Sequence, residues 1–177
     1  MIILEGADCL GKTTAAEALC KRMASEFGGG DSAYYRHMTK PPDTIDHVAH
    51  YFNGVGCHVQ DRYHLGSVTY GRIIGGGSFT TPRRMRVVQQ YLRWMGCVTV
   101  IFVASRQFLA DQLKRAGSRK EMYSRANILD VNEAYWGLAN SSNNGVQWCD
   151  YLIDVTHGWA SQQRLDEIFD AWLRGWM

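Results

Sequence analysis

The residues with the clearest chemical potential lie near the start of the chain, at positions 6–13. This run, Gly6-Ala7-Asp8-Cys9-Leu10-Gly11-Lys12-Thr13, matches the pattern G-x-x-x-x-G-K-[S/T]. Its glycines allow backbone N–H groups to curl around phosphate oxygens, and a following helix would present its positive end to them. Lys12 would then neutralise the β- and γ-phosphates of a nucleotide, and Thr13 would offer its hydroxyl to Mg²⁺. The run predicts a phosphate-binding loop; the competing interpretation is a glycine turn before an ordinary helix.

A second group of reactive side chains follows a short apolar run at 57–60. Asp61 and Arg62 stand side by side where a strand should leave a sheet, at the edge where α/β proteins bind ligands. The Asp61 carboxylate could hold Mg²⁺ or accept a hydroxyl proton, and Arg62 could fork onto a phosphate. The alternative is a surface Asp–Arg pair with Asp61 as a helix N-cap. The phosphate loop upstream favours the functional interpretation.

Both groups need elements that bring strand ends to one edge. Short apolar runs predict strands at 2–4, 33–37, 57–60, 97–103 and 151–155. Helical periodicity covers 13–27, 44–52, 64–74, 82–95, 106–116, 128–139 and 160–176, and positions 75–77 and 141–145 are predicted surface loops. Alternating strands and helices predict an α/β fold with a parallel sheet covered on both faces. With no linker or repeat, positions 1–177 are expected to form a single domain.

Other classes of nucleotide-binding protein lack support in the sequence. The guanine-reading N-K-x-D of a switch GTPase does not occur, and the most apolar run, 98–103, ends in Ala-Ser rather than in the acidic pair of an ATPase motor. The five cysteines are odd in number and form no C-x-x-C pair, so they indicate reduced thiols rather than disulfides or a zinc site. No signal peptide or membrane-length apolar run is present, and we expect a cytoplasmic protein that contacts no membrane.

Several segments together resemble thymidylate kinase and the wider group of P-loop deoxynucleotide and deoxynucleoside kinases, including bacteriophage members. They are 4–8 running into 11–14, the Asp-Arg-Tyr at 61–63 followed by Val-Thr-Tyr at 68–70, and the segments 109–115, 121–123 and 131–135. The resemblance covers nearly the whole chain and is most specific in the two loops. It implies a P-loop kinase fold with a five-stranded parallel sheet in the order 2-3-1-4-5, a short lid, and Mg²⁺-dependent γ-phosphoryl transfer from ATP.

The resemblance also implies roles for individual residues. The ATP phosphates would be bound by the loop and the first helical turn, namely Gly6, Asp8, Cys9, Leu10, Gly11, Lys12, Thr13 and Thr14. On the acceptor side, Asp8 matches the acid near the sugar, Tyr70 the aromatic that favours deoxyribose, and Arg62 the arginine that binds the acceptor's phosphate. Lys40 and Arg36 match the basic position that assists it. Mg²⁺ would be held by Thr13 and Asp61.

A basic segment at about 115–126 corresponds to the lid of this kinase group. Phosphoryl transfer needs cations around its transition state, and a mobile arginine supplies one only when substrate is present. Some thymidylate kinases carry this cation in the phosphate loop, where this chain has Cys9. Arg119 or Arg125 is therefore the expected catalytic cation, while the alternative is a solvated basic turn.

The acceptor side departs from the family pattern. Only positions 38–56 replace a longer helical segment that, in thymidylate kinases, carries the residues that read the base. A nucleoside monophosphate of the thymidylate type is the expected acceptor. The alternative is a modified pyrimidine in DNA, of the 5-hydroxymethyluracil type, with Asp61 as the base that deprotonates its hydroxyl. A non-catalytic P-loop nucleotide-binding module is a further alternative, and family members are commonly homodimers.

Charge is distributed unevenly along the chain. Residues 1–60 hold 5 basic and 7 acidic side chains, residues 61–125 hold 12 and 3, and residues 126–177 hold 2 and 7. The formal net charge of +2 therefore conceals a middle segment of +9 between segments of −2 and −5. Phosphate chemistry explains part of this excess but not the arginines at 83, 84 and 86. They form either a solvated helix face or a nucleic-acid groove.

Aromatic and imidazole side chains are not assigned to the site. Three tryptophans fall in amphipathic helices and are expected in the core, while Trp94, Trp148 and Trp159 flank loops. The histidines match no metal-binding spacing and are interpreted as structural or surface residues, with only His64 close to Asp61 in sequence.

Overall fold

The computed structural model describes residues 1–37, 47–74, 81–116, 124–143 and 146–176. A five-stranded parallel sheet lies at its centre, in the order β2-β3-β1-β4-β7. Its strands are β1 (Ile2–Gly6), β2 (Tyr35–His37), β3 (Val59–Asp61), β4 (Val98–Val103) and β7 (Tyr151–Asp154). In chain order these strands run 2-3-1-4-5, so the predicted α/β fold and sheet order are confirmed.

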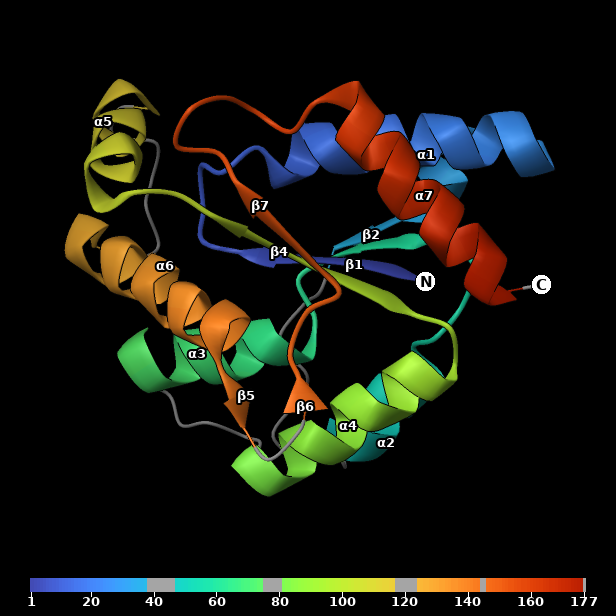
Figure 1. Ribbon diagram of the computed structural model, residues 1–177, viewed down its shortest axis with the longest axis horizontal. Coiled ribbons are helices and arrows are strands. Elements are labelled where there is room, and N and C mark those ends of the chain that lie inside the picture. The colour runs from blue at the N-terminus through green and yellow to red at the C-terminus, as the bar shows by residue number, and fades with distance from the viewer. Residues whose placement is uncertain (38–46, 75–80, 117–123, 144–145, 177) are drawn as a thin grey trace.

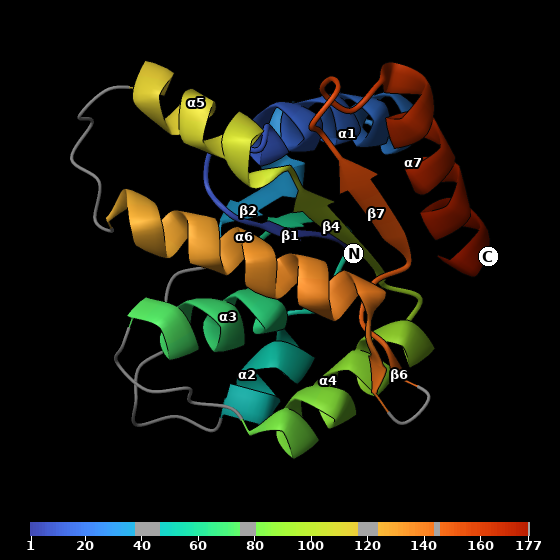
Figure 2. The same cartoon turned by 60° about the vertical axis from the view of Figure 1, so that its left-hand side comes forward.

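Helices cover both faces of this sheet, as Figures 1 and 2 show. On one face α1 and α7 pack together, and the other face is covered by α3 and α6 and by the neighbouring pair α2 and α4. The helices are α1 (Lys12–Phe27), α2 (His47–Asn53), α3 (His64–Ile74), α4 (Pro82–Trp94), α5 (Arg106–Ala116), α6 (Arg125–Asn140) and α7 (Gln162–Trp176). Among the described helices, none is long and apolar enough to cross a membrane.

The two central strands are buried because both of their faces are covered. Every residue of β1 is buried, as are the last five of β4, which explains why these runs are apolar and β-branched rather than alternating. Ile2 and Leu4 join a large core with α1 and α7, while Ile3 points the other way into a smaller core with Tyr51 and Leu92. Glu5 is the one ionisable residue of β1, and it too is fully buried.

Local capping fixes the starts of two helices, and one of them differs from the start that periodicity predicts. The Ser124 hydroxyl accepts a hydrogen bond from the backbone N–H of Asn127, so α6 begins at Arg125 rather than at 128. Thr81 caps α4 in the same way by accepting from the N–H of Arg84, with Pro82 in the first turn. The lid was expected at about 115–126, but its first residues belong to α5 and Arg125 belongs to α6. Positions 117–123 lie outside the described residues.

Two expectations about the chain were wrong in detail. The segment expected as a strand from 33 begins as a 3₁₀ helix, Asp31–Tyr34, and pairs with β3 only over Tyr35–His37. The loop expected at 141–145 contains strand residues, because β5 (Ser142–Asn143) pairs antiparallel with β6 (Val146–Gln147). Two-residue strands carry no periodic signal. The expected helix at 44–52 is present from His47, and positions 44–46 lie outside the described residues.

Candidate functional site

The phosphate loop has the predicted strand–loop–helix context. β1 ends at Gly6, and α1 begins at Lys12 with Gly11 as its N-cap in the left-handed region, at φ 77°. No side chain caps this helix, so its first N–H groups are available to an anion. A side chain at Gly6 would place its Cβ 2.5 Å from the carbonyl oxygen of Phe102 on the neighbouring strand, which explains the first glycine of the motif.

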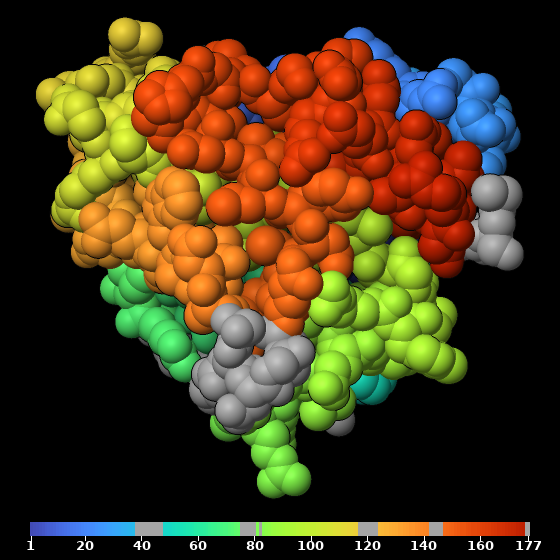
Figure 3. All heavy atoms as spheres, viewed as in Figure 1, coloured from blue at the N-terminus to red at the C-terminus, as the bar shows by residue number. Residues whose placement is uncertain are grey.

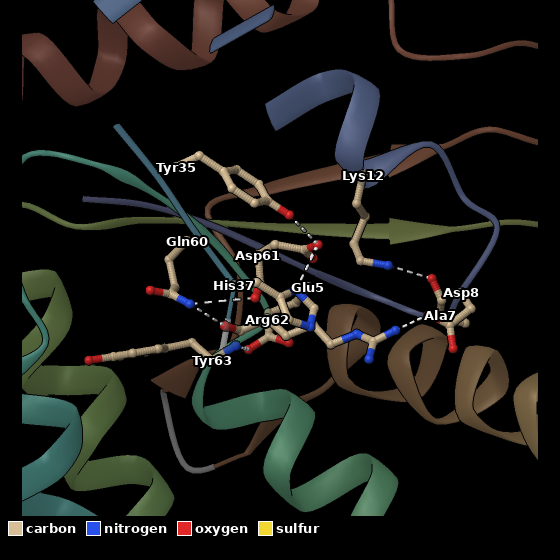
Figure 4. Close-up of polar contacts among 10 residues, drawn as sticks. All are labelled: Glu5, Ala7, Asp8, Lys12, Tyr35, His37, Gln60, Asp61, Arg62 and Tyr63. Atoms are coloured by element: carbon tan, nitrogen blue, oxygen red, sulfur yellow. Dashed lines mark hydrogen bonds and ion pairs between the residues drawn. The ribbon is translucent and has the colours of Figure 1, made fainter. Parts of the chain in front are cut away.

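Lys12 is buried inside this loop. Its ammonium donates a 2.6 Å hydrogen bond to the carbonyl oxygen of Ala7, across the loop (Figure 4). Burial lowers the pKa of Lys12, and the positive charge of Arg62 lowers it further, while nearby carboxylates oppose the shift. An anion in the loop would stabilise the ammonium, so the loop is electrostatically suited to phosphate.

The Asp-Arg turn leaves the sheet directly beside the loop. Asp61 is the last residue of β3 and pairs in register with Leu4 of β1. Arg62 adopts a left-handed backbone conformation, φ 60°, and its N–H donates to the carbonyl oxygen of Leu4 at 2.8 Å. Such a conformation is costly for a residue with a side chain, so the surroundings must hold it in place.

Glu5 provides much of that support from beneath the turn. One carboxylate oxygen accepts from the backbone N–H groups of Tyr63 at 2.9 Å and Leu65 at 3.0 Å. The other accepts from the hydroxyl of Tyr135 on α6 at 2.8 Å. Burial nevertheless raises the pKa of Glu5 to about 7, against the opposing effect of these hydrogen bonds. The carboxyl group thus ties β1, the Asp61–Arg62 turn and α6 together.

Arg62 joins the turn to the phosphate loop. Its guanidinium forms an ion pair with the carboxylate of Asp8 (Figure 4) and lies 4.6 Å from the ring centre of Tyr70. Three residues predicted from separate segments for the acceptor side therefore meet in space. The arrangement leaves a guanidinium in contact with an aromatic ring and a carboxylate, next to the buried ammonium of Lys12.

Asp61 has neighbours that the sequence interpretation did not include. One carboxylate oxygen accepts from the Tyr35 hydroxyl at 3.1 Å and lies 3.2 Å from Nδ1 of His37. Burial and the charge of Asp61 raise the pKa of Tyr35 to about 12, which keeps it a donor. The other oxygen, Oδ1, is buried and has no hydrogen-bond partner among the described residues. The spacing of Tyr35 and His37 could have indicated that both side chains lie on one face of the strand, because strand residues two positions apart share a face.

The side chains available to a metal ion are few and all supply oxygen. Within the described ranges no cluster of three or more His, Cys, Asp or Glu side chains is arranged to hold a metal. Thr13 is exposed in the first turn of α1, and Asp61 offers its unpartnered oxygen. This sparse oxygen set fits Mg²⁺, which is usually held by one or two protein oxygens together with substrate phosphates and water.

Trp159 was not assigned to the site, but it lies against the phosphate loop. A Cβ at Gly11 would come within 2.8 Å of its Cε3 atom, and its ring meets Phe108 edge-on at 5.8 Å. Trp159 also borders a cavity of about 320 Å³ whose other walls include Leu10, Ala15 and Leu165. Trp159 follows β7 at the ligand-binding edge of the sheet, and that position was the signal that could have identified it.

The remaining predicted site residues lie elsewhere or outside the described residues. Arg36 is exposed and stands between Tyr35 and His37 on β2, so its side chain points to the opposite face from Asp61. Arg125 is exposed in the first turn of α6. Lys40 and Arg119 lie outside the described residues. Among the loop residues, Cys9 and Thr14 are exposed, Asp8 is half-buried and Leu10 is buried.

Two other tryptophans and His64 were also placed by the structure. Trp148 was expected to flank a loop but is buried in the core, whereas Trp94 is exposed at the end of α4. His64 is buried and hydrogen-bonded to Gln89 at 2.6 Å, so it belongs to the helix packing.

Comparison with known proteins bears on the fold. No family model matches the sequence, and no curated protein matches it. The sheet order and the loop between β1 and α1 define an α/β protein with a phosphate-binding type of loop between its first strand and first helix. A solved structure that shares this fold is the YorR protein of Bacillus subtilis, crystallised in complex with phosphorylated GDP. The two chains are 20% identical, with a TM-score of 0.68 over 98% of this chain and 96% of that chain.

Proposed function

We propose that the protein transfers the γ-phosphoryl group of ATP to a deoxypyrimidine acceptor, with a nucleoside monophosphate of the thymidylate type as the preferred candidate. The observation that carries this proposal is the contact between two predicted groups of residues. Lys12 lies inside the phosphate loop, and the ion pair between Arg62 and Asp8 holds the acceptor-side turn against that loop. Donor and acceptor phosphates would therefore meet at one edge of the sheet. A complex of YorR with phosphorylated GDP is consistent with nucleotide chemistry on this fold.

The donor half of the reaction uses the loop and α1. The free N–H groups at the start of α1 would bind the β- and γ-phosphates, and Lys12 would leave the Ala7 carbonyl to neutralise them. The cavity beside Trp159 would accept the nucleobase between apolar walls. Thr13 and Asp61 would hold Mg²⁺. That ion supplies charge neutralisation on the transferred group.

The acceptor half uses the Asp61–Arg62 turn. Arg62 would bind the acceptor's phosphate, Tyr70 would pack against the sugar, and Asp8 would lie beside it. An acceptor oxygen forms the new bond to the γ-phosphorus, and the bond from that phosphorus to the β-phosphate oxygen breaks, releasing ADP. Arg119 or Arg125 would supply the transition-state cation that Cys9 cannot. Lys40 would assist Arg62; Arg36 faces away, and we do not include it.

A pyrimidine hydroxyl within DNA is the second candidate acceptor. It is favoured by the basic α4 helix, which the phosphate chemistry of a free nucleotide does not explain. With this acceptor, Asp61 would receive the hydroxyl proton as the new phosphate ester forms.

A labelling experiment separates these candidates. ATP labelled at its γ-phosphate is incubated in parallel with dTMP, dUMP, deoxynucleosides, and DNA oligonucleotides with and without 5-hydroxymethyluracil. Label in a diphosphate product supports the preferred acceptor, and label only in DNA contradicts it and supports the second. ATP hydrolysis that no acceptor stimulates would contradict both and indicate a catalytically weak P-loop nucleotide-binding module. Lys12→Ala is the control, because it removes the loop ammonium and should show no transfer.

A further inference from the structure

The exposed face of α4 carries an unusual set of side chains. Trp94 is 80% exposed, Val87 is 47% exposed, and Met95, directly after the helix, is 37% exposed. Large apolar side chains at this level of exposure are costly to leave in water and often mark binding surfaces. Figure 3 shows α4 on the lower part of the molecular surface, and Figure 2 shows it at the edge of the molecule, beside α2.

The aromatic rings of this region form a row. Phe52 of α2 stacks on Tyr91 with ring centres 4.0 Å apart and an angle of 28°, and Tyr91 lies 6.1 Å from Trp94. Positions 84, 87, 91 and 94 are spaced by three or four residues and therefore share one side of the helix. We call this surface the α4 ridge, defined as Phe52, Arg83, Arg84, Val87, Tyr91 and Trp94.

The ridge is also strongly basic. The helix contains four arginines and no acidic residue. Arg93 is neutralised by Asp150 at 2.8 Å, but within the described residues Arg83, Arg84 and Arg86 take part in no ion pair. Both Arg83 and Arg84 are exposed at the amino end of α4, at the opposite end of the helix from Trp94. A row of rings thus continues into a pair of free positive charges.

We propose that the α4 ridge binds single-stranded nucleic acid, with bases stacked on Trp94 and Tyr91 and phosphates bound by Arg83 and Arg84. Aromatic platforms beside a basic track are the features that bind single strands without sequence preference. A second copy of this chain is a poorer occupant. A two-fold contact through the ridge would bring together two helices that each carry four arginines and no acidic residue, and like charges repel.

This inference rests on the proposed function, because it would supply DNA to the second candidate acceptor reaction. The carboxyl end of α4 leads into β4 at the amino edge of the sheet, so Arg83 and Arg84, at the amino end of the helix, lie farther from that edge. Nucleic acid bound along the ridge would extend away from the amino edge of the sheet.

The test measures binding of a fluorescent oligothymidylate of about 20 nucleotides by anisotropy, without ATP and over a range of salt concentrations. Wild type should bind, and Trp94→Ala should weaken binding about 5- to 150-fold because one stacking platform is lost. Trp94→Phe retains a ring and should keep most of the affinity. Arg83→Ala combined with Arg84→Ala should reduce the slope of log affinity against log salt by about 1.4, since each phosphate contact on a single strand contributes about 0.7. Arg174→Ala, an exposed arginine of α7, is the matched charge control and should bind as wild type does.

Three results would overturn the proposal. These are no binding by wild type, equal binding by Trp94→Ala and wild type, or a wild-type dimer that Trp94→Ala converts to a monomer with oligonucleotide affinity unchanged. The last result, from sedimentation, would assign the ridge to a second copy.

The proposed function is tested separately by label transfer to dTMP, which Trp94→Ala should leave at the wild-type rate. Transfer without oligonucleotide binding overturns the ridge proposal alone. Ridge-dependent binding without any transfer overturns the proposed function alone.

Discussion

Replacing Glu5 by glutamine tests the electrostatics of the turn that holds Asp61 and Arg62. Glu5 is fully buried, and its pKa rises from 4.5 to about 7 in the folded protein, chiefly through burial. Between these two pH values the folded state binds more protons than the unfolded state, so the stability that Glu5 contributes is complete below pH 4.5 and falls as the pH rises through 7. At 1.36 kcal/mol per pKa unit, the loss is about 3 kcal/mol.

Glutamine reproduces the protonated form of Glu5 at every pH. Its carbonyl oxygen can accept from the N–H groups of Tyr63 and Leu65, and its amide can donate to the Tyr135 hydroxyl, which can accept as well as donate. Relative to wild type, Glu5→Gln should therefore gain about 3 kcal/mol of unfolding free energy between about pH 5 and about pH 8. Urea unfolding at both pH values measures this difference.

Tyr135→Phe provides the opposite perturbation. It removes the hydroxyl that donates to Glu5 and leaves a buried carboxylate oxygen without that partner, at a cost of about 1–3 kcal/mol. Because the lost bond favours the ionised form of Glu5, this variant should be destabilised more at about pH 8 than at about pH 5.

For Glu5→Gln, the compared quantity is its unfolding free energy minus that of wild type. A difference that is the same at both pH values, or that falls as the pH rises, would refute the reasoning.

Three further variants test individual residues of the site. Asp61→Asn can still accept hydrogen bonds from Tyr35 and His37, so it should melt like wild type in circular dichroism but lose at least about 10²-fold in turnover; near-wild-type turnover would remove Asp61 from the mechanism. Gly11→Ala places a side chain on a residue with φ 77° and against Trp159, so it should cost about 1–2 kcal/mol or more of unfolding free energy and lower the melting temperature. Adding Trp159→Ala should recover part of that loss, and no recovery would argue against the contact. Arg119→Ala and Arg125→Ala should lower kcat more than KM in steady-state kinetics, and unchanged kcat in both would place the transition-state cation elsewhere.

The parts of the fold that the sequence predicts are those with a local signal. The phosphate loop follows from fixed spacing of Gly6, Gly11 and Lys12, and the sheet follows from alternating strands and helices. Asp61 was located because it ends a strand, and the carboxyl ends of parallel strands share an edge. Arg62 contacts Asp8 and Tyr70 in the structure, and the acceptor-side roles of these three residues stay a prediction.

The parts that escaped prediction depend on contacts between distant segments. In the sequence, Glu5 is only a polar residue at the end of an apolar run. The folded chain shows that it accepts hydrogen bonds from both the turn and α6. His37 and Trp159 carry no motif, and each acquires its place by packing against Asp61 or Gly11. The β5–β6 hairpin is stabilised by one pair of two-residue strands, too short for any periodicity to register.

The central claim is that the loop ammonium and the turn carboxylate serve one phosphoryl transfer reaction. A single-turnover measurement with limiting γ-labelled ATP, excess acceptor and enzyme above ATP tests it most directly. The account predicts that label moves to the acceptor in wild type, that Lys12→Ala transfers none and binds ATP poorly, and that Asp61→Asn binds ATP but transfers at least about 10²-fold more slowly. Equal transfer by wild type and Lys12→Ala would contradict the account.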